Sequence, residues 1–182
     1  VFCNVAGADQ TTFLKQYSEF GLKIDVAGGV TDTVLMWNAG KEAAQGVWTL
    51  IWWGDLDNAW TKNFVTKYRQ KYGFPPENQA WGDYTSIKVL AEAIKMAGTT
   101  DSKKVVEALE KVKFDGGKGR ELYYRTYDHQ LMQPMYVVDI KKTGNKDKWD
   151  IFNVVAEVPG KDESLEVIAP TKEENPCNMK RA

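Results

Sequence analysis

The first 23 residues, Val1–Lys23 (VFCNVAGADQTTFLKQYSEFGLK), decide the fold class that we expect. A short apolar run opens the stretch, and a loop of small residues, Ala6-Gly7-Ala8-Asp9, follows it. Apolar residues then recur at helical spacing until Gly21, a residue that suits the left-handed position after a helix. The pattern predicts a buried strand, a tight turn and an amphipathic helix.

A loop of this kind is a candidate ligand-binding element. In an open α/β sheet it lies beyond the carboxyl end of its strand, where ligands bind. Small residues let a ligand approach the backbone, and the first helical N–H groups favour an anionic or carbonyl group. We therefore treat Ala6, Gly7, Ala8 and Asp9 as candidate ligand-binding residues. The alternative is a plain strand-to-helix connection that binds nothing.

Composition and charge exclude several classes of function. The chain has 182 residues, of which 43% are hydrophobic, and this is enough for one or two small cores. A net charge of −1 gives no electrostatic reason to expect binding to nucleic acid or an anionic membrane. The longest apolar run, Gly46–Trp53, is far shorter than the roughly 20 residues of a membrane span. Because the chain starts directly on a strand pattern, we expect a mature or truncated portion of a longer protein.

Cysteine and histidine give no metal motif. Cys3 lies in the first strand pattern and Cys177 in a polar tail, so a disulfide and an inert buried Cys3 thiol both remain open. His129, the single histidine, excludes a multi-histidine metal site, and we expect it to have a structural role rather than to act as a base. We expect no metal and no cofactor.

The next segments extend the α/β pattern. Residues 24–30 predict a second short strand that ends in a turn at Gly28-Gly29. Thr31 or Asp32 can cap a short helix, and Val47–Trp53 predicts a third strand. Strands that alternate with helices imply a parallel sheet with right-handed crossovers.

The character of the chain changes after Gly54. Three amphipathic helices are predicted: one that Gly73 ends, one over Gly82–Ala97, and one from an Asp101 or Ser102 cap to about Val112. No segment of residues 54–113 supplies a sheet for them. The later part predicts a Gly-rich turn at Phe114–Gly119, strands at Tyr123–Arg125, Met135–Ile140 and Trp149–Val158, and an irregular tail from Pro159.

Neither the turn nor the aromatic residues indicate catalysis. The Gly-rich turn lacks the preceding strand and the Lys-Ser/Thr ending of a phosphate-binding loop. No cluster of acid, base and nucleophile is present, and we expect a protein that is not an enzyme. Five tryptophans could line an apolar pocket: Trp48, Trp52, Trp53, Trp60 and Trp81. We expect Trp48 and Trp52 in the core, and we treat Trp53 as a ligand-binding candidate that could equally be a core residue.

The order of short motifs resembles a known family. The motifs are Gly7-Ala8-Asp9, Phe13-Leu14-Lys15-Gln16, Gly21-Leu22, Ala44-Gln45-Gly46-Val47, Phe64-Val65…Tyr68…Tyr72-Gly73…Pro75, Tyr84…Leu90-Ala91…Ala97-Gly98 and Arg125…Asp128-His129-Gln130. Together they resemble the later half of a type I periplasmic binding protein of the branched-chain amino acid (Leu/Ile/Val) group, the substrate receptors of ABC importers.

The resemblance implies a Venus-flytrap fold of two α/β lobes, each a parallel sheet flanked by helices, joined by three crossing strands. Residues 1–53 are then expected in the ligand-binding second lobe and the helices and turn of residues 54–134 in the first lobe. Residues 135–182 return to the second lobe and end in the tail. The N-terminal part of the first lobe is missing. Hinge crossings are expected at Trp52-Trp53-Gly54 and near Tyr136.

The resemblance also implies a non-enzymatic function. The protein is expected in the periplasm or lipid-anchored outside the membrane, delivering a small polar or aromatic solute (amino acid, amide or carboxylate) to the permease of an ABC importer. The alternatives are the ectodomain of a signalling receptor and, less so, an α/β enzyme. A membrane span after the tail would indicate the ectodomain, and Met179–Ala182 contains none.

The site is implied only in part. In the family the second lobe faces the ligand with the loops that correspond to Ala6–Asp9 and to Ala27–Val30, which contains Gly28 and Gly29. Leucine-binding members hold the ligand ammonium with a tyrosine and a glutamate, where this chain has Ala6 and Gly29. This difference leads to the hypothesis of a larger ligand, or one without an amino group.

Overall fold

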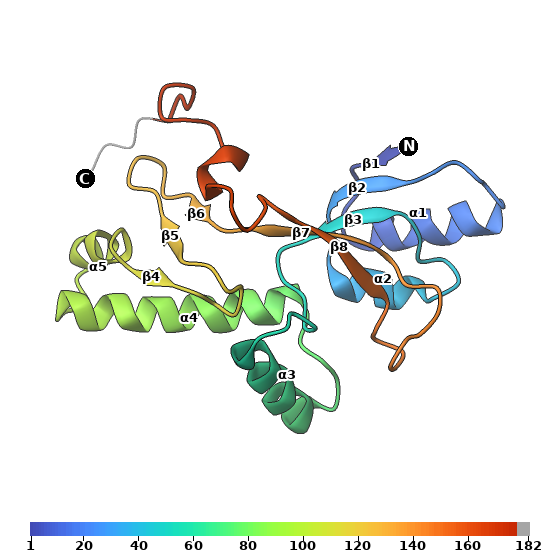
Figure 1. Cartoon of the computed structure of the whole chain (residues 1–182), viewed down its shortest axis with the longest axis horizontal. Helices are drawn as coiled ribbons and strands as arrows, with labels where there is room; N and C mark the ends of the chain where they lie inside the picture. The colour runs from blue at the N-terminus through green and yellow to red at the C-terminus, as the bar shows by residue number, and fades with distance from the viewer. Residues whose placement is uncertain (178–182) are drawn as a thin grey trace.

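A computed structural model describes residues 1–177, and within them the strands form one sheet of five strands and one of three (Figure 1). The helices are α1 (Ala8–Glu19), α2 (Thr33–Ala39), α3 (Ala59–Tyr72), α4 (Asn78–Ala97), α5 (Ser102–Leu109) and the 3₁₀ helix η1 (Leu165–Ile168). The strands are β1 (Phe2–Cys3), β2 (Ala27–Val30), β3 (Val47–Leu50), β4 (Lys113–Phe114), β5 (Leu122–Tyr124), β6 (Leu131–Met132), β7 (Met135–Ile140) and β8 (Phe152–Val158).

The larger sheet has the order β1-β2-β3-β7-β8. β1, β2 and β3 are parallel, as the alternation of strands and helices predicted, whereas β7 and β8 are antiparallel to their neighbours. Helices α1 and α2 pack on this sheet through Leu14, Tyr17 and Met36, which are buried together with Trp48 and Phe152. We call this unit the sheet region, and its mixed sheet confirms the predicted α/β class.

The remaining elements form a second unit, which we call the helical region. It contains α3, α4, α5 and the small antiparallel sheet β4-β5-β6. This small sheet was not expected: β4 and β6 have only two residues each, too few to show an alternating pattern. The tail was expected to be irregular, but it includes η1, whose Leu165 is buried against Leu122 and Met132.

Helix boundaries follow from capping. α3 begins where the Asn58 side chain accepts a hydrogen bond from the Thr61 N–H (2.8 Å), and it ends at Gly73, which has a φ of 80°. α4 begins at Asn78, four residues before the predicted start at Gly82. Glu77 accounts for the difference, because its carboxylate accepts hydrogen bonds from the first free N–H groups of the helix.

The predicted Gly-Gly turn is wrong. Gly28 and Gly29 lie inside β2, and the chain turns only after Val30. Packing explains why a strand carries glycine here: a Cβ on Gly28 would lie 2.2 Å from Cζ3 of the Trp48 ring. Nothing lies within 4 Å of a Cβ on Gly29. β3 also ends at Leu50, three residues before the predicted end at Trp53.

Three segments connect the two regions within residues 1–177: β3 to α3, β6 to β7, and β8 to η1. All three leave the larger sheet at one edge, since Leu50 pairs with Tyr136, and Tyr136 pairs with Glu157. Figure 1 shows these neighbouring strand ends where the sheet region meets the helical region. This edge is also the carboxyl edge of the parallel strands β1 and β2.

Asn78, the first residue of α4, ties the helical region to the sheet region. Its side chain is buried, donates to the Thr31 carbonyl oxygen (2.9 Å) and accepts from the Trp52 N–H (3.3 Å). Both partners are backbone groups near the ends of sheet strands, where no ladder satisfies them. The amide therefore satisfies two buried groups with one side chain.

The structure places both cysteines and the single histidine. Cys3 is buried and Cys177 is exposed, and both are free thiols, so the described structure has no disulfide between them. Nε2 of His129 lies 3.0 Å from Oε1 of Glu110, and the His129 backbone has a φ of 55°. The structural role of His129 stays a prediction. Residues 1–177 contain no cluster that could hold a metal ion and no helix long and apolar enough to cross a membrane. Met179–Ala182 lie outside the described residues.

We predict that Gly28→Ala destabilises the protein by about 2 kcal/mol, because the added methyl group would overlap the Trp48 ring in a packed core. Gly29→Ala is the matched control and is expected to change the free energy of unfolding by less than about 1 kcal/mol. Urea denaturation measures both. Equal stabilities of the two variants would contradict the packing of Trp48 on Gly28.

We predict that Asn78→Ala lowers the free energy of unfolding by about 2 kcal/mol, since it leaves a buried N–H group and a buried carbonyl oxygen without partners. Asn63→Ala, at an exposed position of α3, is expected to change it by no more than about 0.5 kcal/mol. The same denaturation experiment compares the pair. A loss as small as that of the control would show that Asn78 does not join the two regions.

Candidate functional site

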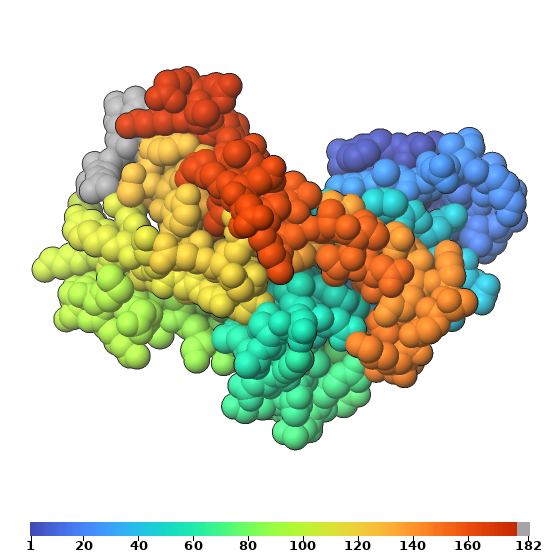
Figure 2. Space-filling model, viewed as in Figure 1, coloured from blue at the N-terminus to red at the C-terminus, as the bar shows by residue number. Residues whose placement is uncertain are grey.

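The carboxyl edge of β1 and β2 brings together two loops. Residues 4–7 follow β1 and lead into α1, and Thr31-Asp32 follow β2 and lead into α2. Figure 1 shows both loops on the side of the sheet that faces the helical region, and Figure 2 shows the surface notched between the β1 end of the sheet and the η1 segment. Ligands of parallel α/β sheets bind at such an edge.

The first loop presents backbone rather than side chains. Ala6 and Gly7 lie in this loop, whereas Ala8 and Asp9, which were predicted to lie in it, form the start of α1. All four residues are exposed, and Gly7 has a φ of 63°, which favours glycine. Gly7 is the N-cap of α1, and no side chain caps this helix end. The first N–H groups of α1 are therefore able to bind an anionic group, although the Asp9 carboxylate in the same turn opposes it.

The second loop carries a carboxylate. Asp32 is half-buried directly after β2, and it accepts a hydrogen bond from the Gln79 side-chain amide of α4. Thr31 is buried beside it and donates through Oγ1 to Oε1 of Gln10 in α1 (3.0 Å). This bond places the start of α1 next to the end of β2. The edge thus combines an uncapped helix N-terminus with a carboxylate.

The predicted site residues separate into two groups. Ala6, Gly7, Ala8 and Asp9 lie together at the carboxyl edge, while Gly29 lies within β2 and is half-buried.

The other two candidates pack against aromatic rings, Gly28 half-buried in β2 and Trp53 in the core. Gly28 lies against Trp48, and Trp53 is buried with its ring edge-on to Phe152, at 5.3 Å between centroids. Trp48 and Trp52 are buried, as predicted.

Three polar residues of this edge were missed: Gln10, Asp32 and Asn78. Gln10 lies on the buried face of α1, together with Leu14 and Tyr17. A glutamine on the apolar face of a helix predicts a buried hydrogen bond, and this pattern could have identified it. Asp32 was considered only as a helix cap, although no side-chain cap bond forms at α2. No local sequence pattern predicts the role of Asn78, because its partners Thr31 and Trp52 are distant in the sequence.

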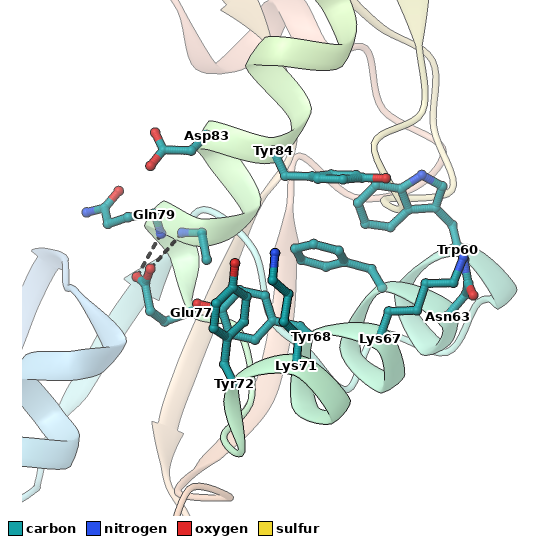
Figure 3. Close-up of a pocket in the computed structure, with 12 residues that line it drawn as sticks. Trp60, Asn63, Lys67, Tyr68, Lys71, Tyr72, Glu77, Gln79, Asp83 and Tyr84 are labelled. Carbon is teal, nitrogen blue, oxygen red and sulfur yellow. Dashed lines mark hydrogen bonds between the residues drawn. The ribbon is translucent and has the colours of Figure 1, made fainter.

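An aromatic groove of about 530 Å³ lies between α3 and the first half of α4 (Figure 3). Five aromatic side chains line it: Trp60, Phe64, Tyr68, Tyr72 and Tyr84. Lys67 and Lys71 border it on α3, and Glu77, Gln79 and Asp83 border it on α4. Burial raises the pKa of Tyr68, so this phenol is neutral at physiological pH. Trp60 is the one tryptophan of the five considered that lines this groove.

Comparison with solved structures gives the same architecture. A periplasmic binding protein from Burkholderia mallei is 28% identical, with a TM-score of 0.83 over 97% of this chain and 46% of that one. A branched chain amino acid ABC transporter periplasmic ligand-binding protein from Burkholderia xenovorans is 25% identical, with a TM-score of 0.74 over 91% of this chain and 44% of that one.

A third similar structure is a solute binding protein of an ABC transporter from Rhodopseudomonas palustris, in complex with 3,4-dihydroxybenzoic acid. It is 24% identical, with a TM-score of 0.72 over 86% of this chain and 44% of that one. The chain thus spans less than half the length of these solved relatives.

The model of one protein family covers most of the chain. The periplasmic binding protein family matches residues 1–145, and these contain the carboxyl edge and all of α1 to α5. Its members are binding proteins, which agrees with the expectation of a protein that is not an enzyme. The chain belongs to the family of periplasmic binding proteins and is related to the branched-chain amino acid receptors of ABC transporters.

Proposed function

We propose that the chain is the later half of an ABC-importer solute receptor and that its carboxyl edge is the second-lobe wall of the ligand cleft. The sheet region then belongs to the second lobe, with residues 1–53 and the strands of residues 135–158, and residues 54–134 belong to the first lobe. The single observation that carries the proposal is that the Thr31–Gln10 hydrogen bond places the uncapped start of α1 next to the loop that carries Asp32.

Exposed apolar surface supports the assignment of lobes. On α4 the buried face is formed by Trp81, Thr85 and Val89, while Ile87 and Leu90 are exposed, Ile87 to 68%. An apolar stripe on a long helix is expected to cover another layer. The first-lobe sheet, which the family resemblance assigns to an earlier part of the receptor, would cover it.

The site favours a ligand with an α-amino acid headgroup. A free amino acid carries a carboxylate, which suits the N–H groups of α1, and an ammonium group, which suits Asp32. The hypothesis of a larger ligand, or one without an amino group, depended on Ala6 in the first loop and on Gly29 as the residue of the second loop. Since β2 continues through Gly29, Asp32 is the acidic residue that comes directly after the strand.

An aromatic carboxylate is the second candidate ligand. Val5 and Val30 are exposed at the same edge, and Val30 is 55% exposed, so an apolar ring would find apolar partners there. The receptor from Rhodopseudomonas palustris binds 3,4-dihydroxybenzoic acid. A ligand of this class needs the α1 N-terminus but not the Asp32 carboxylate.

The cellular setting is inferred from the family. We propose a periplasmic receptor, with or without a lipid anchor, that hands its solute to an ABC-importer permease. The alternative, a ligand-sensing ectodomain, uses the same cleft but would continue beyond the tail into a membrane span. Deletion of the receptor gene should abolish uptake of the solute if the first proposal holds.

We predict that the full-length receptor binds leucine in isothermal titration calorimetry and that Asp32→Asn weakens this binding about 30-fold, since it removes a charged partner of the ammonium group. Binding of 3,4-dihydroxybenzoate, where it occurs, is expected to be unchanged by the same substitution. The matched control is Asp162→Asn, at an exposed position near the tail.

Two results would contradict this assignment. Leucine binding that is equal in the Asp32→Asn and Asp162→Asn variants would remove Asp32 from the site. Tight binding of 3,4-dihydroxybenzoate with no binding of leucine would assign the receptor to aromatic carboxylates instead.

A further inference from the structure

The Gly-rich segment Asp115–Arg120 has no part in the site above, but its backbone is closely fitted to the helical region. Gly116, Gly117 and Gly119 have φ values of 62°, 79° and 70°, conformations that favour glycine. A Cβ on Gly117 would lie 2.3 Å from Cε3 of Trp60. The backbone conformation of this loop therefore requires glycine at three positions.

Hydrogen bonds fix this loop to α3 and α4. The Gly116 carbonyl oxygen accepts from Nε1 of Trp81 (2.7 Å). The Gly117 carbonyl oxygen accepts from Nδ2 of Asn58 (2.7 Å) and from Oγ1 of Thr61 (3.1 Å). The loop is thereby part of the helical region.

Lys118 extends from the loop into the junction between the two regions. Its Nζ donates to the Ile51 carbonyl oxygen (2.5 Å) on the first connecting segment. It also donates to Oε1 of Gln133 (2.8 Å) and to the Pro134 carbonyl oxygen (2.7 Å) on the second. An ammonium group has three N–H donors, and these three acceptors use all of them.

The surroundings of Lys118 are apolar and aromatic. The residue is 5% exposed, and its Nζ lies 4.8 Å from the ring centroid of Trp81 and 5.4 Å from that of Tyr136. Burial lowers the pKa of Lys118 to about 7, against the opposing effect of the Glu157 carboxylate. Burying a charge is costly, and such charges are retained in some proteins because they specify one geometry.

Arg120, two residues further along, holds the third connecting segment. Its Nη1 donates to the carbonyl oxygens of Pro159 (2.9 Å) and Gly160 (3.0 Å) and lies 3.4 Å from the Glu157 carboxylate. Its Nη2 donates to the Glu163 carbonyl oxygen (2.5 Å). The planar guanidinium group has several N–H donors in a fixed arrangement, so it can bind several oxygen acceptors at once.

We propose that Asp115–Arg120 is a hinge clamp, in which Lys118 and Arg120 hold all three connecting segments of the described chain and thereby set the angle between the two regions. The hinge clamp rests on the proposed function for its purpose, which is to limit lobe rotation during ligand capture. Its geometry is independent of any ligand. In two-lobed receptors a few residues at the segment ends absorb the rotation.

Pulsed electron paramagnetic resonance on the full-length receptor tests the clamp. Nitroxide labels are placed at Lys15→Cys on α1 and Lys103→Cys on α5, both exposed positions, in a Cys177→Ser background that prevents labelling of the tail. The interlabel distance is measured without ligand at pH 6, where Lys118 carries its proton. Lys118→Met and Arg120→Leu are each expected to broaden the distance distribution about twofold.

Lys111→Met, a substitution of an exposed lysine, is the matched control and should leave the distribution unchanged. If Lys118→Met does not fold, Gln133→Ala replaces it, because it removes one of the three acceptors and keeps the lysine. Distributions in the clamp variants as narrow as in the control would overturn the proposal. Adding leucine or 3,4-dihydroxybenzoate tests the proposed function separately: no shift with either would contradict those ligands and leave the ligand-free comparison intact.

Discussion

The structure depends on one constraint: the three segments that join its two regions leave the larger sheet at the same edge. β3, β7 and β8 are adjacent strands, and their antiparallel order places the end of β3, the start of β7 and the end of β8 side by side. A buried ammonium group at Lys118 meets the first two segments through backbone and side-chain oxygens. The connections are thus held together by polar contacts in an apolar setting, which makes their geometry specific.

The same edge carries the loops that face the proposed ligand cleft. Thr31 lies at the centre of this arrangement, because its hydroxyl meets Gln10 of α1 and its carbonyl oxygen meets Asn78 of α4. Thr31, the neighbour of Asp32, therefore contacts both the start of α1 and the helical region. In the proposed function, these two hydrogen bonds of 3.0 and 2.9 Å would link ligand binding to the angle between the regions.

The two regions differ in how completely they are packed. The sheet region buries a continuous core around Trp48, with α1 and α2 on the sheet. The helical region is divided into smaller clusters and exposes an apolar stripe on α4 around Ile87. In the proposed function, another half of the receptor would supply a layer over this stripe. The solved relatives are more than twice as long as the part that this chain matches.

The sequence by itself determined the α/β class, the parallel order of the first three strands and the existence of a turn before the first helix, because these follow from local periodicity and from turn residues. Only the tertiary structure decided the extent of β2, since Gly28 is required by the Trp48 ring rather than by a turn. It also decided the roles of Asp32, Asn78 and Lys118. Their partners come from distant segments, and a local pattern contains no information about which distant oxygen a side chain will meet.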